Sequence, residues 1–398
     1  MKRKLDLLTH LKELAGVFFK LGIIGFGGPA AHIAMMEHEV VSKKNWMTRE
    51  HFLDLIGATN LIPGPNSTEM AMHCGYHRAG WLGMIVAGLG FIIPATLITG
   101  AIAWFYQQYG SIPDIKPIWY GIRPAVLAII INAVYKFGKK ALKNWQLGIV
   151  GAAVMIASLA GMSEVIVLLA SGLLGMFWLS FGQKIEHVKQ SFFPLPLLSA
   201  KPGYLKTAIA ATALSAGQVA GNVSLVKLFL VFLKIGSVLF GSGYVLIAYL
   251  QDEIIDRLGW LTQQQLVDAI AVGQFTPGPV SSAVTFVGYQ IIGIKGAILA
   301  TIGMFLPSFF FVAMLNPLIP KMRTSKWVSC FLDSVNVGSV AIMAVAVIQL
   351  ARASLINWQT WLIALMGVAV TFIFKKVNTL WIVIGSSIVG YLLTLVRL

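Results

Sequence analysis

The sequence carries little charge for its length, and this shortage excludes a soluble globular domain. Only 11% of the 398 residues are charged, whereas 57% are hydrophobic. Soluble domains contain about 25% charged residues, so a soluble chain of this composition would lack an adequate polar surface. The composition therefore predicts a protein that is embedded in a membrane.

Cysteine is almost absent as well. The chain contains two cysteines, Cys74 and Cys330, and no Cys-x-x-Cys motif. Two isolated thiols cannot form a disulfide framework, and the sequence offers no redox motif. We therefore expect no cofactor and no resident metal.

Acidic residues are half as frequent as basic ones. The 30 Lys and Arg residues stand against 15 Asp and Glu, which gives a net charge of +15. In a soluble chain this excess would indicate a nucleic-acid partner, but here the basic residues lie mostly in short connections between apolar runs. We interpret them as topology signals on the cytoplasmic side. Membrane lipid is the expected partner, and nucleic acid is not.

About twelve apolar runs follow one another along the chain, most of them near the roughly 20 residues that span a bilayer. They lie near residues 18–36, 52–75, 81–106, 117–135, 146–162, 165–181, 225–250, 266–289, 293–315, 331–351, 360–374 and 380–396. This pattern predicts an all-α polytopic membrane protein whose spans include re-entrant helices. A polar stretch at 183–220 predicts a linker between an N-terminal half, 1–182, and a C-terminal half, 221–398.

The two halves are related by an internal repeat. Lys20 recurs as Lys234, and a tryptophan, a threonine and several glycines and prolines recur with it. Because the matches include charges within apolar runs, the halves share a structural device. Basic residues late in the second half satisfy the positive-inside rule only if the halves are antiparallel. We therefore favour inverted repeats with broken helices over parallel ones.

A Pro-Gly-Pro sequence interrupts one apolar run in each half. The residues are Pro63, Gly64 and Pro65 in the first half and Pro277, Gly278 and Pro279 in the second. Two prolines remove two backbone donors, so an α-helix cannot continue through the motif. In lipid, broken backbone survives only inside protein or beside water, and paired broken helices are typical of a transport site. We expect the two interrupted segments to meet in the middle of the bilayer.

The residues after each Pro-Gly-Pro are suited to an anion. If Pro65 and Pro279 occupy the first turn of a helix, the following amides lack helical acceptors. These amides belong to Asn66, Ser67 and Thr68 and to Val280, Ser281 and Ser282. Amides and hydroxyls at a helix start can bind a tetrahedral dianion. The alternative is that Pro-Gly-Pro only kinks two packing helices.

Two lysines and an arginine are further candidates for binding the anion. Lys20 and Lys234 lie within apolar runs, where charges usually face a cavity, although a lysine can also reach the membrane surface. Arg123 has a planar fork that can hold an oxyanion with two bonds, or it can contact lipid phosphate. The candidate binding set also includes Gly27, Gly28, Asn60, Gly241, Ser242 and Gln274.

Carboxylates within the repeat could couple transport to protons. Glu69 follows the first Pro-Gly-Pro closely, and Glu39, Asp54 and Glu253 belong to the repeated pattern. The structural alternative for Asp54 is capping and charge pairing in a first helical turn. Glu39 and Glu253 would then lie in loops and pair with a nearby basic residue.

Several motifs together identify a family. They are Phe26-Gly27-Gly28-Pro29, Trp46-x-Thr48 before Phe52-Leu53-Asp54, and Asn60-Leu61-Ile62-Pro63-Gly64-Pro65, each with a second-half echo. The chain thereby resembles the two-domain chromate ion transporter family over nearly its whole length. The resemblance implies a carrier in a membrane of the bacterial inner type that exports chromate and gives chromate resistance, with sulfate as a close analogue. The second half departs from the pattern at Gly241-Ser242-Gly243 and Val280, so two equivalent sites are not implied.

Other functions stay open as alternatives. They are import or exchange of another oxyanion such as sulfate, an anion channel, and a membrane metalloenzyme. The last is raised by Glu69, His73 and His77, which share one helical face, but His38-Glu39 lacks the second histidine of a zinc helix. A homodimer is also open. Export of a dianion from an inside-negative cell would gain about 4.6 kcal/mol at 100 mV.

Overall fold

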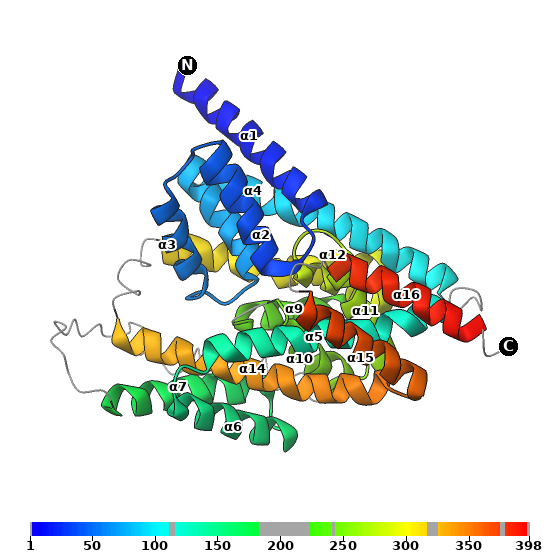
Figure 1. Cartoon of the computed structure of the whole chain (residues 1–398). Coiled ribbons are helices and arrows are strands. Elements are labelled where there is room, and N and C mark those ends of the chain that lie inside the picture. The colour runs from blue at the N-terminus through cyan, green and yellow to red at the C-terminus, as the bar shows by residue number, and fades with distance from the viewer. Residues whose placement is uncertain are drawn as a thin grey trace.

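The computed structural model describes residues 2–110, 116–182, 223–240, 243–316, 325–374 and 379–395, and every regular element in these ranges is a helix (Figure 1). The first half contains α1 (Lys2–Ile24), α2 (Gly28–Glu37), the π-helix η1 (His38–Lys43), α3 (Arg49–Thr59), α4 (Asn66–Tyr109), α5 (Lys116–Ala141), α6 (Trp145–Leu159) and α7 (Glu164–Gly182). The second half contains α9 (Leu225–Val238), α10 (Leu246–Leu250), the π-helix η3 (Gln251–Arg257), α11 (Gln263–Phe275), the 3₁₀ helix η4 (Val280–Ser282), α12 (Ala283–Leu315), α14 (Lys326–Ser354), α15 (Trp358–Ile373) and α16 (Thr379–Leu395).

Apolar helices of membrane-spanning length confirm the predicted class. Within the described ranges, four helices are long and apolar enough to cross a membrane, and these are Asn66–Tyr109, Pro117–Ala141, Val280–Leu315 and Lys326–Ser354. Shorter apolar helices accompany them at Trp145–Leu159, Glu164–Ser180, Trp358–Ile373 and Thr379–Thr394. The chain is therefore an all-α polytopic membrane protein.

The two longest helices bend back on themselves. In α4 the backbone turns at Gly80, which has φ 60° and ψ −146°, and in α12 it turns at Gly293 with φ 65° and ψ −151°. The parts of α4 before and after Gly80 lie in contact, since a methyl group at Gly75 would lie 2.2 Å from the Gly83 carbonyl oxygen. The expected runs 52–75 and 81–106 are therefore joined by a tight helical turn within one element.

The broken segments form hairpins that enter the protein and return. Lys20 Nζ on α1 lies 2.8 Å from Glu39 Oε1 on η1, which directly follows α2. The chain after the break therefore returns alongside α1. The ring centroids of His51 on α3 and His77 on α4 are 4.7 Å apart, so these helices also return to the same end. The tips between the arms contain the glycine-rich break and the Pro-Gly-Pro, and the second half repeats both hairpins.

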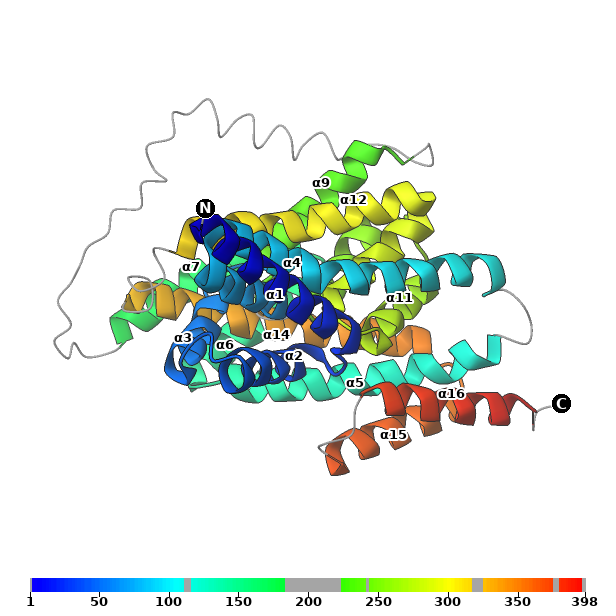
Figure 2. The ribbon, with the colours of Figure 1, turned by 90° about the horizontal axis from the view of Figure 1, so that it is seen from above.

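The halves run in opposite directions. Where α5 ends, Lys143 Nζ donates to Asp333 Oδ1 near the start of α14 at 2.6 Å. Where α5 begins, the Tyr120 hydroxyl donates at 2.6 Å to Asn357 Oδ1, just past the end of α14. Because α5 and α14 are equivalent in the repeat and antiparallel, the preference for inverted repeats is confirmed. The equivalent helices α4 and α12 are packed together in the same antiparallel way (Figure 2).

The two halves are also interlocked. Helix α5 packs on α15 and α16 of the second half, and α14 packs on α6 and α7 of the first. The approach is close, since a methyl group at Gly121 would lie 2.0 Å from the Ser386 carbonyl oxygen. The boundaries of the halves stay a prediction, and the expected linker 183–220 lies outside the described residues.

Equivalent helices of the two halves begin with equivalent N-cap side chains, so these helices start at the same places in both halves. Thr48 Oγ1 accepts a bond from the His51 amide at the start of α3, and Thr262 Oγ1 does the same at the start of α11. Asn144 and Asn357 cap α6 and α15 in the same manner. Such caps satisfy helix amides that lack an intrahelical acceptor.

Candidate functional site

Hairpin tips from both halves meet in the interior of the molecule. The Gly64 amide donates to the Leu239 carbonyl oxygen at 2.6 Å, and the Gly278 amide donates to the Gly25 carbonyl oxygen at 2.8 Å. Each bond joins the Pro-Gly-Pro of one half to the helix break of the other, and the repeat relates the two bonds. The interrupted segments are therefore brought together, as the sequence predicts.

Both Pro-Gly-Pro glycines are required by their surroundings. Gly64 has φ 148° and Gly278 has φ 83°, which L side chains rarely adopt. A methyl group at Gly64 would lie 2.1 Å from Glu69 Oε1, and one at Gly278 would lie 2.5 Å from Ala95 Cβ. The tips can pack this closely only because side chains are absent there.

The free amides are fewer than predicted. Pro65 and Pro279 stand at the N-cap, one residue before the helices begin, instead of within the first turn. The third amide of each set is paired, because Thr68 donates to the Pro65 carbonyl and Ser282 to the Pro279 carbonyl, both at 2.8 Å. Among the described residues, two amides at each tip therefore have no hydrogen-bond acceptor, and the second helix starts as a 3₁₀ turn.

Polar side chains without partners gather at the two tips. Among the buried side-chain atoms of the described residues that form no hydrogen bond, four belong to the tips, and these are Asn66 Oδ1, Thr68 Oγ1, Gln274 Nε2 and Ser281 Oγ. Glu69 is fully buried, and its carboxylate lies beside the Ser308 hydroxyl of the other half. Buried polar groups are normally satisfied, so this concentration favours a place where a polar guest binds.

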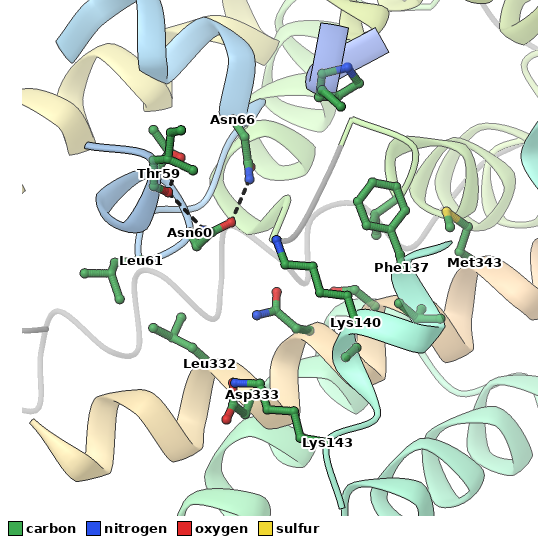
Figure 3. Close-up of a pocket in the computed structure, with 18 of the residues that line it drawn as sticks. Thr59, Asn60, Leu61, Asn66, Phe137, Lys140, Lys143, Leu332, Asp333 and Met343 are labelled. Atoms are coloured by element: carbon green, nitrogen blue, oxygen red, sulfur yellow. Dashed lines mark hydrogen bonds and ion pairs between the residues drawn. The ribbon is translucent and has the colours of Figure 1, made fainter. Parts of the chain in front are cut away.

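A cleft of about 420 Å³ lies beside the first Pro-Gly-Pro, where residues on both sides of the motif line it (Figure 3). Its walls come from α2, α3, α5 and α14. Of the predicted site residues, Asn60 and Asn66 line it, and Asn66 Nδ2 donates to Asn60 Oδ1 at 3.0 Å. The cleft therefore adjoins the tip between α3 and α4.

Basic residues at the end of α5 line the same cleft. Lys143 is paired with Asp333, whereas the Lys140 ammonium reaches into the space near Asn60 and Phe137 (Figure 3). In the sequence these lysines belong to the basic residues that serve as topology signals, and Asn336, which also lines the cleft, is the repeat equivalent of Arg123. No local motif marks them, because the cleft joins segments that are distant in sequence.

Arg123 has a carboxylate partner in the structure. Its Nε donates to Asp268 Oδ1 at 2.7 Å and its second nitrogen to Oδ2 at 2.8 Å, and the Tyr106 hydroxyl adds a bond to Oδ2 at 2.7 Å. The planar fork is therefore already occupied, and its role in binding an oxyanion stays a prediction.

The two candidate lysines are both ion-paired. Lys20 pairs with Glu39, and Lys234 pairs with Glu253 in the equivalent place. The expectation that both glutamates lie in loops was wrong, because they are buried within the π-helices η1 and η3. The Lys20 ammonium holds the pKa of Glu39 below its usual value by hydrogen bonding to it.

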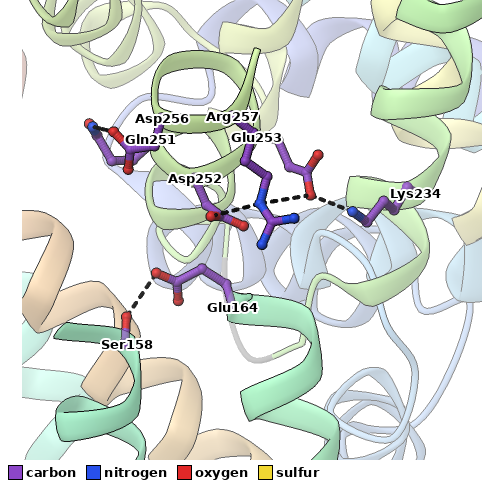
Figure 4. Close-up of polar contacts among 8 residues, drawn as sticks. All are labelled: Ser158, Glu164, Lys234, Gln251, Asp252, Glu253, Asp256 and Arg257. Carbon is purple, nitrogen blue, oxygen red and sulfur yellow. Dashed lines mark hydrogen bonds and ion pairs between the residues drawn. The ribbon is translucent and has the colours of Figure 1, made fainter. Parts of the chain in front are cut away.

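The second of these pairs belongs to a larger charged network around η3 (Figure 4). Arg257 Nε donates to Asp252 Oδ1 at 3.0 Å and lies 4.0 Å from Glu253. Nearby, the Ser158 hydroxyl donates to Glu164 Oε1 at 2.9 Å at the α6–α7 turn. The network joins the charged residues of η3 to one another and to Lys234 on α9.

The remaining predicted residues are placed as follows. Gly27 and Gly28 form the α1–α2 tip with φ 107° and 80°, and a methyl group at Gly28 would lie 2.9 Å from the Tyr244 hydroxyl. Asp54 is exposed on α3. Gly241 and Ser242 lie outside the described residues.

The histidines serve local contacts. His32 Nε2 lies 3.0 Å from the Gly25 carbonyl oxygen, and His73 Nδ1 lies 3.2 Å from Asn316 Oδ1. Among the residues that the structure describes, no three His, Cys, Asp or Glu side chains are grouped to hold a metal ion. These residues therefore add no support to the metalloenzyme alternative.

Two interlocked inverted halves, with hairpin tips meeting inside apolar helices, define a polytopic membrane protein of the inverted-repeat class. The chain belongs to the Chromate transporter family, whose model matches residues 12–176 and again residues 226–391. The chain is therefore a multi-pass member of a family of membrane transporters.

Full-length relatives agree with this family. The chain is 31% identical over 385 residues to a chromate transport protein of Cupriavidus metallidurans, which covers 96% of this chain and 92% of the relative. It is 32% identical over 389 residues to a probable chromate transport protein of Synechococcus elongatus, covering 96% and 95%. A chromate transport protein of Pseudomonas aeruginosa is 28% identical over 400 residues, covering 96% and 92%. No solved structure matches the chain.

Proposed function

We propose that this chain exports chromate across a membrane of the bacterial inner type and thereby gives chromate resistance. The observation that carries the proposal is the pair of reciprocal bonds by which Gly64 and Gly278 join the tips of two inverted halves. Paired broken helices at the repeat interface are typical of substrate sites in secondary transporters. Three full-length relatives are named for chromate transport, and this supports chromate as the substrate.

The direction of transport is argued from charge. The cleft is lined by residues at the end of α5, where Lys136, Lys139 and Lys140 are followed by Lys143, and clustered lysines of this kind mark the cytoplasmic side. A cleft open to the cytoplasm receives the anion from inside the cell. The membrane potential then favours outward movement of a dianion by about 4.6 kcal/mol at 100 mV. Sulfate has the same shape and charge, so it is the second expected cargo.

A carboxylate could add proton coupling to this movement. Of the four predicted coupling residues, Glu69 is the one buried at a tip, whereas Asp54 is exposed and Glu39 and Glu253 are ion-paired. We infer that Glu69 is the best placed to exchange a proton during transport.

The test is uptake of labelled chromate into everted vesicles, with the potential and the pH gradient set separately. We expect uptake driven by a lumen-positive potential, well above that of vesicles without the protein. Asn66→Val, which copies Val280 of the second half, should lower the flux, whereas Val226→Ile, at an exposed position on α9, should leave it unchanged. Flux equal to that of empty vesicles, or driven only in the opposite direction, would overturn the proposal.

A further inference from the structure

The cleft holds one cation that is not neutralised. Lys143 is paired with Asp333 at 2.6 Å, but within the described ranges Lys140 forms no ion pair and no hydrogen bond. Its ammonium is directed into the cleft toward Asn60 (Figure 3). An unpaired ammonium in a partly enclosed space attracts an anion more strongly than one in bulk water, because screening is weaker there.

Uncharged donors accompany Lys140. The side chains of Asn60, Asn66 and Asn336 line the same cleft, and the amide of Asn66 belongs to the free amides at the first tip. Asn60 Nδ2 already donates to the Ile56 carbonyl oxygen at 3.0 Å and Asn66 Nδ2 donates to Asn60 Oδ1 at 3.0 Å, so each keeps one hydrogen for a guest. Together with Asn336 and the Lys140 ammonium, they can donate to several oxygens of a tetrahedral oxyanion at once. The cleft volume of about 420 Å³ leaves room for such an ion with part of its water.

We propose that Lys140, with Asn60 and Asn336, forms a binding site for a divalent tetrahedral oxyanion on the way to the Pro-Gly-Pro tips. This inference rests on the proposed function and names the residue that captures its substrate. Lys140 has no basic equivalent in the second half, where Ala353 occupies the matching position. The site therefore exists only on the side that we assign to the cytoplasm.

Equilibrium binding of labelled chromate and labelled sulfate to the purified full-length protein tests this site. Lys140→Gln should raise the Kd for both ions about tenfold or more, since a hydrogen bond to a charged group is lost. Lys139→Gln is the matched control, because Lys139 carries the same charge one residue away and does not line the cleft. Lys140→Arg should retain most of the affinity and shows that position 140 tolerates substitution.

Each outcome decides the point. Weakened binding in Lys140→Gln alone supports the site, whereas equal affinities in Lys140→Gln, Lys139→Gln and the unchanged protein overturn it. If the unchanged protein binds sulfate but not chromate, and Lys140→Gln abolishes that binding, the oxyanion site stands and the chromate assignment fails.

A second inference comes from the opposite end of the molecule. Asp268 on α11 has no exposed surface, and its carboxylate is held to α5 and α4 by Arg123 and Tyr106. The equivalent residue Asp54 on α3 is exposed, and Asn336, the equivalent of Arg123, lines the open cleft. Helix α11 is thus clamped to both α4 and α5, whereas its counterpart α3 packs chiefly on α4.

We infer that the Asp268–Arg123–Tyr106 cluster is the gate that closes the far side of the site. Breaking the cluster would free α11 from α5, and in the opposite state of the transporter α3 would dock so that Asp54 approaches Asn336. Because Asn336 carries no charge, the second clamp is weaker than the first. The asymmetry therefore favours the state that is open at the cleft.

Cysteine labelling in vesicles tests the gate, after Cys74 and Cys330 are replaced by alanine. Ala141, the last residue of α5, lines the cleft, and its equivalent Ser354, the last residue of α14, is only 3% exposed. With an impermeant maleimide, Ala141→Cys should react from the cleft side, and Ser354→Cys should react very little from the other side. Asp268→Asn, Arg123→Lys and Tyr106→Phe should each raise the labelling rate of Ser354→Cys severalfold.

The three variants differ in how much of the cluster they remove, so a folding defect in one does not decide the result. A rate that rises in the order Tyr106→Phe, Arg123→Lys, Asp268→Asn supports the gate. Ready labelling of Ser354→Cys in the unchanged protein, or a rate that no variant alters, would overturn it.

Discussion

Helices α3 and α11 occupy the same place in the repeat but have different surroundings. Leu53 on α3 is 54% exposed, whereas its equivalent Val267 on α11 is 3% exposed. Helix α3 packs chiefly on α4, but α11 packs on α5, α12, α14 and α16. The repeat therefore specifies the hairpin and its tip, and the docking of each hairpin is set separately. In an inverted-repeat protein, this difference corresponds to one side being open and the other closed.

The largest effect should come from breaking the clamp that distinguishes the two helices. Asp268→Asn leaves the Arg123 guanidinium without its carboxylate, and loss of one partner from a buried pair costs roughly 3 kcal/mol or more. Asp54→Asn changes the equivalent residue at an exposed site, where substitutions usually stay within about 0.5 kcal/mol. Thermal unfolding of the purified protein in detergent should show a lower Tm for Asp268→Asn alone. Equal shifts for the two variants would mean that the docking difference has no energetic basis.

The two tips should respond differently to the same added methyl group. At Gly278 the methyl would meet Ala95 Cβ at 2.5 Å and the Gly22 carbonyl oxygen at 3.2 Å, and neither can move away easily. At Gly64 it would meet the ends of the Glu69 and Ser308 side chains, which can rotate. Overpacking and backbone strain each cost roughly 1–3 kcal/mol.

Gly278→Ala should therefore lower the Tm more than Gly64→Ala. Gly64→Ala should instead change transport more than stability, since it displaces Glu69. Both properties can be followed in the same preparation by unfolding in detergent and by flux in vesicles. A Gly64→Ala protein with unchanged flux would show that the place of Glu69 is not important for transport.

Sequence reasoning predicts the devices that are local. Pro63 to Pro65 break a helix whatever surrounds them, because two donors are missing. The recurrence of Lys20 as Lys234 in the second half of the sequence indicates the repeat. The inverted orientation of the halves follows from the distribution of basic residues. These features depend on residues close in sequence or on a rule about sides of a membrane.

The cleft and the clamp could not be predicted in the same way. Lys140 and Asn60 are 80 positions apart, and only the packing of α3 beside α5 and α14 brings them to one space. Arg123 and Asp268 are 145 positions apart, and nothing in either segment of the sequence indicates that their side chains meet. Which of the two hairpins packs against α5 or α14 depends on tertiary packing. The repeat alone would predict the same packing for α3 and α11.

A smaller difference is expected at the caps of α6 and α15. Asn357 accepts from the Thr360 amide and also from the Tyr120 hydroxyl of the other half, whereas Asn144 accepts only the Leu147 amide among the described contacts. Loss of a cap costs about 1 kcal/mol, and the additional hydrogen bond adds about as much. Asn357→Ala should lower the Tm about twice as far as Asn144→Ala. Equal shifts would mean that the Tyr120 bond between the halves adds nothing.

The smallest effect is expected where the two halves agree. Lys20 pairs with Glu39 and Lys234 with Glu253, and each glutamate also has a basic residue four positions along, Lys43 or Arg257. Since Lys20 is 51% exposed, Lys20→Gln should cost less than about 1 kcal/mol, and Lys234→Gln should cost a similar amount.

The Lys20 pair also has a defined pH dependence. Because Lys20 lowers the pKa of Glu39 in the folded state, the pair stabilises the fold above the ordinary value of 4.5, and this contribution is lost as the pH falls below it. The Tm of Lys20→Gln should therefore lie slightly below that of the unchanged protein at pH 7, and the two should converge below pH 4.5. A gap that widened on acidification would mean that Lys20 does not stabilise the Glu39 carboxylate.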